Sequence, residues 1–383
     1  FGVYVHIPFC SHICPYCDFN TYALKKIPEE EYVNSLIQEI QVIKKNRIYD
    51  SNISSIYFGG GTPSLFSPKS ISLIIDRLNQ SFGFNQIEIT IEVNPGEISY
   101  EKLSDYKNSG INRFSFGVQS FNDNTLKILG RRHNQKDIYA AYELCQKAQL
   151  ENISFDLIYA APQQSLQDLE SDIKKYLKLN LQHISCYSLT IEKGTPFYKS
   201  YSDGKLIIPE DETNLLMLDL INQELSSSGY NRYEISNYAK PSYESKHNLS
   251  YWNYSNYLGL GAGAHSFYRI FGYKGIRSSN IAKPYEYIDK IKNDLSSLAW
   301  SDKLSLEDCI FEYTILGLRK IDGILLDNFN EIFDLDFSNF YQKQLDKLKE
   351  LDLVELKDNS VSLTKKGIPI ADSVNDIFAE KFI

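Results

Sequence analysis

Cys10-Ser11-His12-Ile13-Cys14-Pro15-Tyr16-Cys17 carries three of the six cysteines of this 383-residue chain. The segment follows a β-rich run over residues 2–8 that predicts a strand, so the three thiols lie in the loop after the first strand. Close cysteine spacing in a chain of this size indicates metal or redox chemistry before it indicates a disulfide framework. The C-x3-C-x2-C spacing is therefore the pattern from which the rest of the chain is interpreted.

The number of cysteines favours an iron-sulfur cluster with one open iron. A structural [4Fe-4S] cluster normally takes four cysteines, so a cluster held by Cys10, Cys14 and Cys17 leaves one iron for S-adenosylmethionine (SAM). The reduced cluster would cleave the sulfonium of SAM and release a 5′-deoxyadenosyl radical. The alternative is a Cys3His zinc site that recruits His6 or His12, because zinc accepts such sets in four-coordinate geometry.

Strands and helices alternate after the cysteine loop. This pattern predicts successive βα units around a parallel sheet. A Rossmann fold would alternate in the same way, but here polar residues recur at the carboxyl ends of the strands, where (β/α) barrels build their active sites. We therefore expect a partial (β/α)6 barrel over residues 1–205. The predicted strands are 2–8, 54–59, 87–93, 113–119, 153–159 and 183–190, and the predicted helices are 29–46, 68–80, 99–109, 134–149 and 165–179.

The polar residues at these strand ends form a candidate ligand site. Gly59-Gly60-Gly61-Thr62 would let the backbone approach a ligand, although the same sequence also suits a plain tight turn. Glu92, Gln119 and Asp156 follow on later strands, and each alone would suit a satisfied structural polar group. Together with Arg131 they could bind the hydroxyls and the carboxylate of a nucleoside-like ligand.

The remainder of the chain predicts two smaller regions. Residues 206–300 begin with a helix at 210–228 and continue as an α+β region of short strands and loops. Residues 301–383 predict three helices (304–319, 325–332 and 338–350) and two strands (353–356 and 360–363), which is a winged-helix-like pattern. Acidic residues outnumber basic ones in this module, so nucleic-acid binding is not expected.

Composition narrows the classes of function. The formal net charge is −9 and the pI is near 5.3, which opposes a nucleic-acid partner. No apolar run is long enough to predict an integral membrane protein, and a cytoplasmic location is expected. Cys145, Cys186 and Cys309 are predicted to be ordinary buried cysteines, and His133 and His183 to have structural roles.

Several motifs together carry a family resemblance. His6-Ile7-Pro8-Phe9-Cys10, GGGTP at 59–63, IEVNP at 91–95, GVQSF at 117–121 and DLIY at 156–159 resemble the radical SAM family of oxygen-independent (HemN-like) coproporphyrinogen III oxidases and their relatives. Residues 232–238 and His247-Asn248-Leu249-Ser250-Tyr251-Trp252 resemble the HemW-type heme chaperone branch, with its HNxxYW motif. The resemblance covers essentially the whole chain.

The resemblance implies roles for individual residues. Cys10, Cys14 and Cys17 would hold the [4Fe-4S] cluster. The residues that would surround the SAM on the cluster are Tyr4, Gly59, Gly60, Gly61, Thr62 and Glu92. The positions that contact a second SAM in the oxidase branch are Tyr16, Gln119, Arg131 and Asp156.

A heme site is expected at the HNxxYW motif. His247 offers an imidazole for iron, and Tyr251 and Trp252 offer flat apolar surfaces for a porphyrin. Without the resemblance, His247 would be interpreted as a hydrogen-bonding structural histidine. His265, at the end of Gly259-Leu260-Gly261-Ala262-Gly263-Ala264, is a second, weaker candidate.

Two functions follow from these expectations. The first is a heme chaperone that binds heme and delivers it to heme-requiring acceptor proteins while carrying a [4Fe-4S] cluster and SAM. The second is a radical enzyme that decarboxylates coproporphyrinogen III. The oxidases carry another cysteine two residues after the third, and Phe19 stands at that position, which argues for the chaperone. The sequence leaves the oligomeric state open, with a homodimer as one arrangement.

Overall fold

The first strand, β1 (Gly2–Ile7), shows how the sheet is organised. Val3, Val5 and Ile7 are fully buried on one side of β1, while Tyr4 and His6 line a cavity on the other side. This alternation follows from the two-residue period of a strand. One face of the sheet therefore packs on helices and the opposite face carries polar and aromatic side chains.

The computed structural model describes residues 1–46, 49, 52–270 and 274–382. Its strands, besides β1, are β2 (Phe9–Cys10), β3 (Tyr22–Ala23), β4 (Ser55–Gly60), β5 (Glu88–Val93), β6 (Arg113–Gln119), β7 (Ile153–Tyr159), β8 (His183–Ser188), β9 (Asn231–Arg232), β10 (Asn237–Ala239), β11 (Tyr257–Leu260), β12 (His265–Ile270), β13 (Lys274–Asn280), β14 (Leu298–Leu304), β15 (Ile324–Leu325), β16 (Val354–Lys357) and β17 (Ser360–Leu363). Its α-helices are α1 (Glu29–Asn46), α2 (Pro68–Phe82), α3 (Tyr100–Asn108), α4 (Asp123–Ile128), α5 (Gln135–Lys147), α6 (Leu166–Leu179), α7 (Pro196–Ser202), α8 (Asp211–Ser227), α9 (Lys246–Trp252), α10 (Pro284–Lys292), α11 (Leu306–Gly317), α12 (Leu326–Phe333), α13 (Phe337–Phe340), α14 (Gln342–Glu350) and α15 (Ala371–Ala379).

A single sheet runs through the barrel and the following region. Its strand order is β14-β13-β12-β11-β1-β4-β5-β6-β7-β8-β10-β9. The run from β1 through β4 to β8 is parallel, which confirms the predicted six-stranded partial barrel. β11 extends it in parallel beside β1, and β12 to β14 add an antiparallel ribbon.

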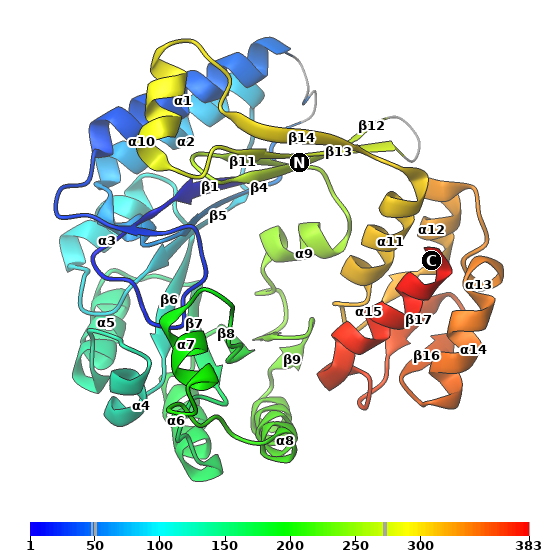
Figure 1. Ribbon diagram of the computed structural model, residues 1–383. Helices are drawn as coiled ribbons and strands as arrows, with labels where there is room; N and C mark the ends of the chain where they lie inside the picture. Colours follow the sequence, from blue (N-terminus) through cyan, green and yellow to red (C-terminus); the bar gives the residue numbers. More distant parts are fainter. Residues whose placement is uncertain (47–48, 50–51, 271–273, 383) are drawn as a thin grey trace.

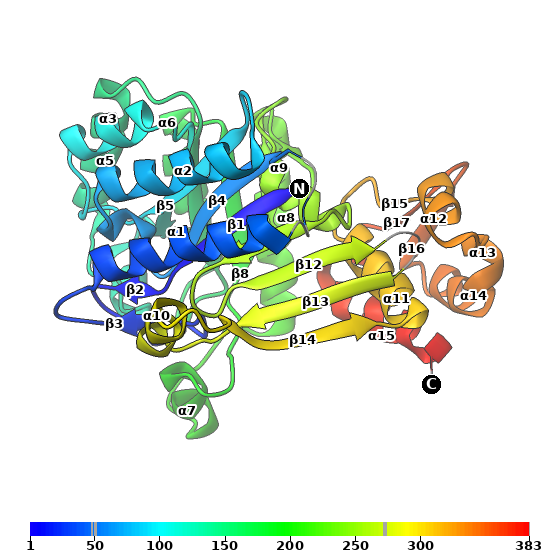
Figure 2. The same ribbon diagram turned by 90° about the horizontal axis from the view of Figure 1, so that it is seen from above.

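Helices cover the outer face of the parallel part of this sheet (Figures 1 and 2). The main core lies between them and the strands, and it includes Leu36 and Ile40 of α1 and Ile74 and Leu78 of α2. Local signals fix where the helices begin. Ser67 accepts a hydrogen bond from the Ser70 amide just before α2, and Ser165 forms a capping box before α6, as expected for such sequences.

The C-terminal module has a separate core. Phe329, Phe337, Tyr341 and Phe378 are fully buried in it. It contains a three-stranded antiparallel sheet of order β15-β17-β16, and β16 and β17 follow α11 to α14, as the predicted winged-helix-like pattern requires. The module is joined to the large sheet by the ion pair of Arg277 with Glu312, in which Nη2 lies 2.7 Å from Oε2.

The structure also departs from the sequence-based expectations in several places. Residues 246–252, expected among strands and loops, form helix α9. The helix expected at 338–350 is divided into α13 and α14, and α15 was not predicted. The boundary expected at residue 300 falls inside β14, and the strands of 206–300 extend the barrel sheet.

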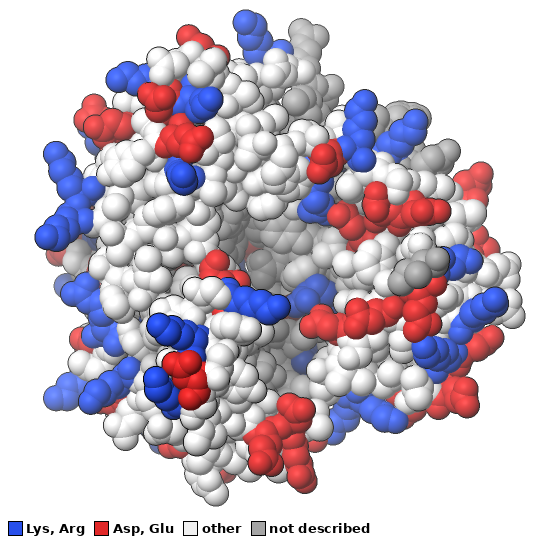
Figure 3. Space-filling model, in the orientation of Figure 1, with Lys and Arg blue, Asp and Glu red and all other residues white. Residues whose placement is uncertain are grey.

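A deep hollow opens between the barrel and the C-terminal module (Figure 3). Behind it in Figure 1 lies α9, which connects the two parts of the molecule. Throughout the described ranges, no helix combines the length and apolar character needed to cross a bilayer.

Candidate functional site

The three cysteines of the N-terminal loop line one cavity of about 420 Å3. The Thr62 hydroxyl donates to Cys10 Sγ at 3.6 Å, and Arg131 Nη1 donates to Cys14 Sγ at 3.5 Å. Burial raises the pKa of the Cys10 thiol to about 11, partly offset by the Thr62 hydrogen bond. These contacts provide hydrogen-bond donors for sulfur ligands, as iron-sulfur sites require.

The two candidate metal groups require different arrangements of the three thiols. A tetrahedral zinc ion would require ligands about 2.0–2.3 Å from one point, whereas the thiolates of a [4Fe-4S] cluster bind different iron atoms. Among the described side chains, no three His, Cys, Asp or Glu residues form a group that could hold one metal ion.

The glycine loop packs tightly beside the cysteines. A Cβ atom on Gly61 would lie 2.6 Å from the Phe9 carbonyl oxygen, and one on Gly60 would lie 2.5 Å from the His6 ring. Gly60 also has φ of +115°, a conformation that side chains disfavour. The glycines therefore allow β4 to end directly against the cysteine loop.

Glu92 forms the wall behind this loop. Its carboxylate accepts hydrogen bonds from Tyr57 Oη at 2.9 Å and from the Gly60 amide at 3.1 Å. Burial raises the pKa of Glu92 to about 7. A buried carboxyl with so few donors would favour an additional cationic partner, such as an amino group.

Asp156 and Arg131 occupy the far side of the same cavity. Asp156 accepts from Ser185 Oγ at 2.7 Å and from Ser115 Oγ at 3.1 Å, and burial raises its pKa. Arg131 Nη2 donates to Asn94 Oδ1 at 2.7 Å and to the Gly117 carbonyl at 2.8 Å. Its buried Nε has no hydrogen-bond partner within the described part of the chain, so the guanidinium retains an unused donor.

The structure brings most of the sequence-predicted SAM residues together. Tyr4 and Gly59 are placed differently: Tyr4 lines a neighbouring cavity, and Gly59 lies behind Tyr4, Tyr57 and Glu92. The sequence did not single out Tyr57 or Asn94. The only sequence feature that marks them is that each lies at or next to the end of a predicted strand, on the side that faces the cavity. The predicted residues that line the cluster cavity are Tyr16, Gly60, Gly61, Thr62, Glu92, Gln119, Arg131 and Asp156.

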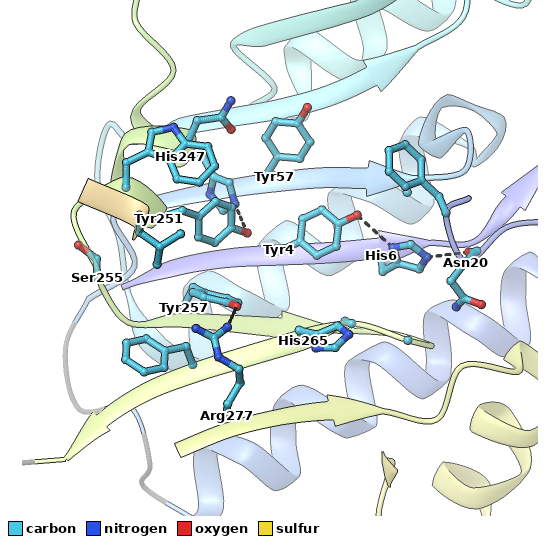
Figure 4. A pocket seen from close by; sticks show the side chains of 18 of the residues that line it. Tyr4, His6, Asn20, Tyr57, His247, Tyr251, Ser255, Tyr257, His265 and Arg277 are labelled. Carbon is cyan, nitrogen blue, oxygen red and sulfur yellow. Dashed lines mark hydrogen bonds between the residues drawn. The ribbon is translucent and has the colours of Figure 1, made fainter. Parts of the chain in front are cut away.

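The neighbouring cavity has a volume of about 570 Å3 and a largely aromatic lining (Figure 4). It lies over β1, β11, β12 and β13 on the inner face of the sheet, beside α9. The cluster cavity and this aromatic cavity share Phe19, Tyr57, Gly60 and Glu92. Aromatic residues on its walls include Tyr4, Tyr251, Trp252, Tyr254, Tyr257 and Phe267.

His247 lies at the wall of the aromatic cavity with both ring nitrogens engaged. Nδ1 is 2.9 Å from Ser55 Oγ, and Nε2 is 2.9 Å from Tyr251 Oη. Only 1% of the residue is exposed, and burial lowers its pKa to about 3. Both ring nitrogens thus contact hydroxyl groups, and iron binding by His247 stays a prediction.

Helix α9 explains why His247 is held so firmly. The Glu88 carboxylate accepts from the amides of Lys246 at 3.1 Å and His247 at 3.0 Å, and Ser245 caps the same turn. A carboxylate at a helix N-terminus satisfies free amides and the helix dipole. The first half of the HNxxYW motif is thus fixed against the barrel.

The second half of the motif faces the aromatic cavity. Tyr251 lies edge-on to Tyr257, with ring centroids 4.7 Å apart. The Arg319 guanidinium lies 4.5 Å from the centroid of the Trp252 ring. Both motif aromatics therefore line the cavity and are held by neighbours.

The other predicted structural residues are confirmed in that role. His133 hydrogen-bonds to the Val118 carbonyl at 2.9 Å, and His183 contacts Ser154 and Tyr233. Three free cysteines away from the N-terminal loop are buried, namely Cys145, Cys186 and Cys309.

Comparisons with known proteins agree with this architecture. Residues 4–176 match the Radical SAM superfamily, and residues 304–370 match the HemN C-terminal domain. Coproporphyrinogen III oxidase (HemN) from Escherichia coli has a solved structure that matches with a TM-score of 0.82 and 24% identity, covering 98% of this chain and 89% of that one. This likeness shows the fold.

Sequence relatives specify the family further. Heme chaperone HemW of Bacillus subtilis (strain 168) is 37% identical over 380 residues, which cover 98% of both chains. Heme chaperone HemW of Lactococcus lactis subsp. lactis (strain IL1403) is 36% identical over 98% of this chain and 97% of that protein. Because both likenesses extend over nearly the full length, this chain belongs to the HemW family of radical SAM proteins.

Proposed function

We propose that this protein binds heme and delivers it to heme-requiring acceptor proteins, with a [4Fe-4S] cluster on Cys10, Cys14 and Cys17 and SAM beside it. The observation that carries the proposal is the aromatic cavity that adjoins the cluster cavity. Its volume of about 570 Å3 is in the range of small-molecule sites, which are mostly apolar with a few placed polar groups. A flat, largely apolar porphyrin has the chemistry that such a cavity recognises.

The cavity supplies both kinds of contact that heme requires. Tyr251, Trp252 and Tyr257 offer aromatic surface to the macrocycle. Asn248 and Ser255 add polar groups to the lining. Leu316 of the C-terminal module also lines the cavity, so bound heme would lie between the barrel and this module. The names of the relatives support this function.

The cluster cavity supports a second group beside the heme. When bound, SAM on a reduced cluster supplies radical chemistry by cleavage of its sulfonium bond. The residues that would hold it are Glu92, whose carboxyl can accept from an amino group, and Asp156 and Arg131, which can contact hydroxyls and a carboxylate.

Phe19 distinguishes the proposed function from the oxidase function. Its side chain is 67% exposed and lines both the cluster cavity and the aromatic cavity. An exposed phenyl ring where the two cavities meet provides apolar surface for a porphyrin and cannot donate or accept a proton. This placement favours a binding role at that position over the thiol chemistry of the oxidases.

The test uses anaerobically reconstituted protein with verified iron and sulfide. Heme is titrated by difference absorbance, transfer to an apo-heme protein is followed, and coproporphyrinogen III turnover is assayed with SAM and a reductant on the same sample. We expect stoichiometric binding and transfer without turnover. Turnover without heme binding would make the protein an oxidase and refute the proposal.

A pair of serine variants tests the location of the heme. Ser255→Trp would fill the aromatic cavity, whereas Ser228 is exposed at the end of α8. We expect heme affinity to fall about tenfold or more in Ser255→Trp, equivalent to roughly 1.4 kcal/mol, and to stay at the wild-type value in Ser228→Trp. Equal affinities in the two variants would exclude this cavity as the site.

A further inference from the structure

Gln119 ends strand β6 in a backbone conformation that is unusual for its residue type. Its φ is +68°, and the Ser120 amide donates to the Val118 carbonyl across it at 2.9 Å. A three-residue turn with positive φ at its centre is rare and strained. Such strain persists only where the surrounding structure fixes the backbone, and it is concentrated at functional sites.

The strained turn presents the Gln119 side chain to the cluster cavity. Gln119 lines this cavity together with Arg131 and Asp156. A Cβ atom on Gly117 would lie 3.0 Å from Gln119 Nε2 and 3.3 Å from Arg131 Nη2. The amide of Gln119 and the guanidinium of Arg131 therefore lie close together on one wall of the cavity.

Asp172 of helix α6 holds this turn from behind. Its Oδ2 accepts from the Ser120 hydroxyl, and its Oδ1 accepts from the Phe121 amide at 3.0 Å. Both oxygens of one carboxylate thus bind the two residues that follow Gln119. The Ser120 hydroxyl in turn accepts from the Asn122 amide at 3.0 Å, so the backbone of the turn has little freedom.

The Asp172 carboxylate is too deeply buried to contact a ligand directly. Only 1% of the residue is exposed, and it lies outside the cluster cavity. Burial raises its pKa to about 6, partly offset by the hydrogen bonds from the turn. A buried carboxylate is costly unless donors satisfy it, and here the strained turn supplies those donors. Any effect of Asp172 on a ligand must therefore pass through the turn.

We infer that Asp172 is a positioning residue for the cluster cavity, because it holds the strained turn in which Gln119 contacts the ligand beside Arg131. The inference rests on the proposed function, in which SAM occupies this cavity. The Gln119 amide offers both a donor and an acceptor, so it can contact the carboxylate or the hydroxyls of SAM. These contacts are hydrogen bonds, and no covalent bond changes.

Two variants remove the contacts that hold the turn without changing the cavity lining. Asp172→Asn keeps the size of the side chain but loses one acceptor, and Ser120→Ala removes the hydroxyl that donates to it. The SAM dissociation constant of each cluster-loaded variant is measured anaerobically by equilibrium dialysis. We expect it to rise about tenfold in Asp172→Asn and by a smaller factor in Ser120→Ala.

A double-mutant cycle with Gln119→Gly shows whether Asp172 acts through Gln119. Glycine adopts positive φ readily, so Gln119→Gly should have at least the wild-type urea midpoint while its SAM dissociation constant rises about tenfold. Adding Asp172→Asn to Gln119→Gly should weaken SAM binding no further. A residue that only supports the fold would weaken binding by the same factor in both backgrounds. If Asp172→Asn does not fold, the same cycle is measured with Ser120→Ala.

Glu170→Gln controls for the loss of a negative charge on α6. The Glu170 side chain is 40% exposed and pairs with Lys174, away from the turn. We expect its SAM dissociation constant to equal that of the wild type. Circular dichroism and the iron content verify that each variant is folded and carries its cluster.

The possible results distinguish the inference from the proposed function. If the cluster-loaded wild type does not bind SAM, the SAM part of the proposed function fails, and the inference fails with it. SAM binding with the wild-type dissociation constant in both Asp172→Asn and Ser120→Ala would overturn the inference alone. A loss in Asp172→Asn that remains in full in the Gln119→Gly background would also overturn it, because Asp172 would then act by another route.

Discussion

The buried imidazole of His247 couples the stability of the fold to pH. Its pKa is about 3 in the folded protein and 6.5 when unperturbed. As the pH falls below 6.5, His247 takes up a proton in the unfolded chain but stays neutral in the folded protein. The free energy of unfolding therefore decreases from pH 6.5 towards pH 3. One such group contributes a slope of about 1.4 kcal/mol per pH unit at most.

His247→Gln should remove this part of the pH dependence. We expect its free energy of unfolding to vary less between pH 4 and 6.5 than that of the wild type, measured by urea titration. Ser55→Ala is the control, because it removes the Nδ1 partner of His247 but keeps the imidazole. The control should be less stable than the wild type and keep its pH slope; an unchanged slope in His247→Gln would contradict the assignment.

Arg131 should tune the cluster through its contact with Cys14. Hydrogen bonds and positive charge near ligating sulfur stabilise the reduced, more negative cluster. Arg131→Gln should therefore lower the reduction potential, followed by electron paramagnetic resonance in a redox titration. Arg132 is exposed, and Arg132→Gln should leave the potential at the wild-type value. An equal shift of the reduction potential in both variants would show that the lost positive charge, and not the contact with Cys14, is responsible.

At the scale of elements, the turn between β11 and β12 depends on glycine. Gly261 has φ of +93°, and its Cβ would lie 2.5 Å from the His6 carbonyl oxygen and 2.6 Å from Tyr32 Oη. Gly194 has φ of +90° with no atom within 4 Å of the corresponding Cβ. A side chain at either position would adopt an unfavourable positive φ. Only a side chain at Gly261 would also clash with neighbouring atoms.

Comparing alanine variants separates these two costs. Gly194→Ala should lose about 1–2 kcal/mol of unfolding free energy from the left-handed conformation alone. Gly261→Ala should lose about 3–5 kcal/mol, because backbone and buried side chains must also move. Urea unfolding measures both values. Equal losses of unfolding free energy in the two variants would show that the turn between β11 and β12 accommodates the extra methyl group without strain.

The elements that the sequence predicted share strong local signals. The six parallel strands have short apolar or β-branched runs, and their observed bounds agree with the predicted ones within about two residues. Helix α9 was missed because it is only seven residues long and because Glu88, which caps its first turn, lies far away in sequence. The ribbon of β12 to β14 was missed because β14 is almost wholly exposed and therefore lacks the buried apolar pattern of a core strand.

The candidate site was predictable where motifs mark it. The cysteine triplet, the glycine loop and the polar strand ends could be found from spacing. The occupancy of a histidine's lone pair could not, because it depends on partners such as Ser55 and Asn20 that only the tertiary fold brings together. The sequence favoured His247 over His265 because only His247 lies in the HNxxYW motif.

Across the whole molecule, Glu39 joins several distant segments. Its Oε1 accepts from Asn280 Nδ2 at 2.7 Å and Ser297 Oγ at 3.0 Å, and its Oε2 accepts from Tyr287 Oη at 2.7 Å and the Gly261 amide at 2.9 Å. The carboxylate is thus surrounded by donors from the β11–β12 turn, β13, α10 and the segment before β14. Both oxygens are needed as acceptors.

Glu39→Gln should destabilise the whole fold. In either orientation the new NH2 group would face two donors, so unfolding free energy should fall by about 2–4 kcal/mol. Glu30→Gln on the same helix is the control, because Glu30 is exposed and should change stability by less than about 0.5 kcal/mol. Similar urea midpoints for the two variants would contradict the role of Glu39.

The pairing of β1 with β11 has a consequence for synthesis on the ribosome. Gly2 lies opposite Tyr257 in the register of these strands, so β1 waits for a strand that is made much later. Until then, one edge of β1 is unpaired in the nascent chain, and such edges promote wrong associations. β11 must therefore be translated before this edge of β1 can pair, and the cysteine loop leaves the ribosome long before the strands that will complete its surroundings.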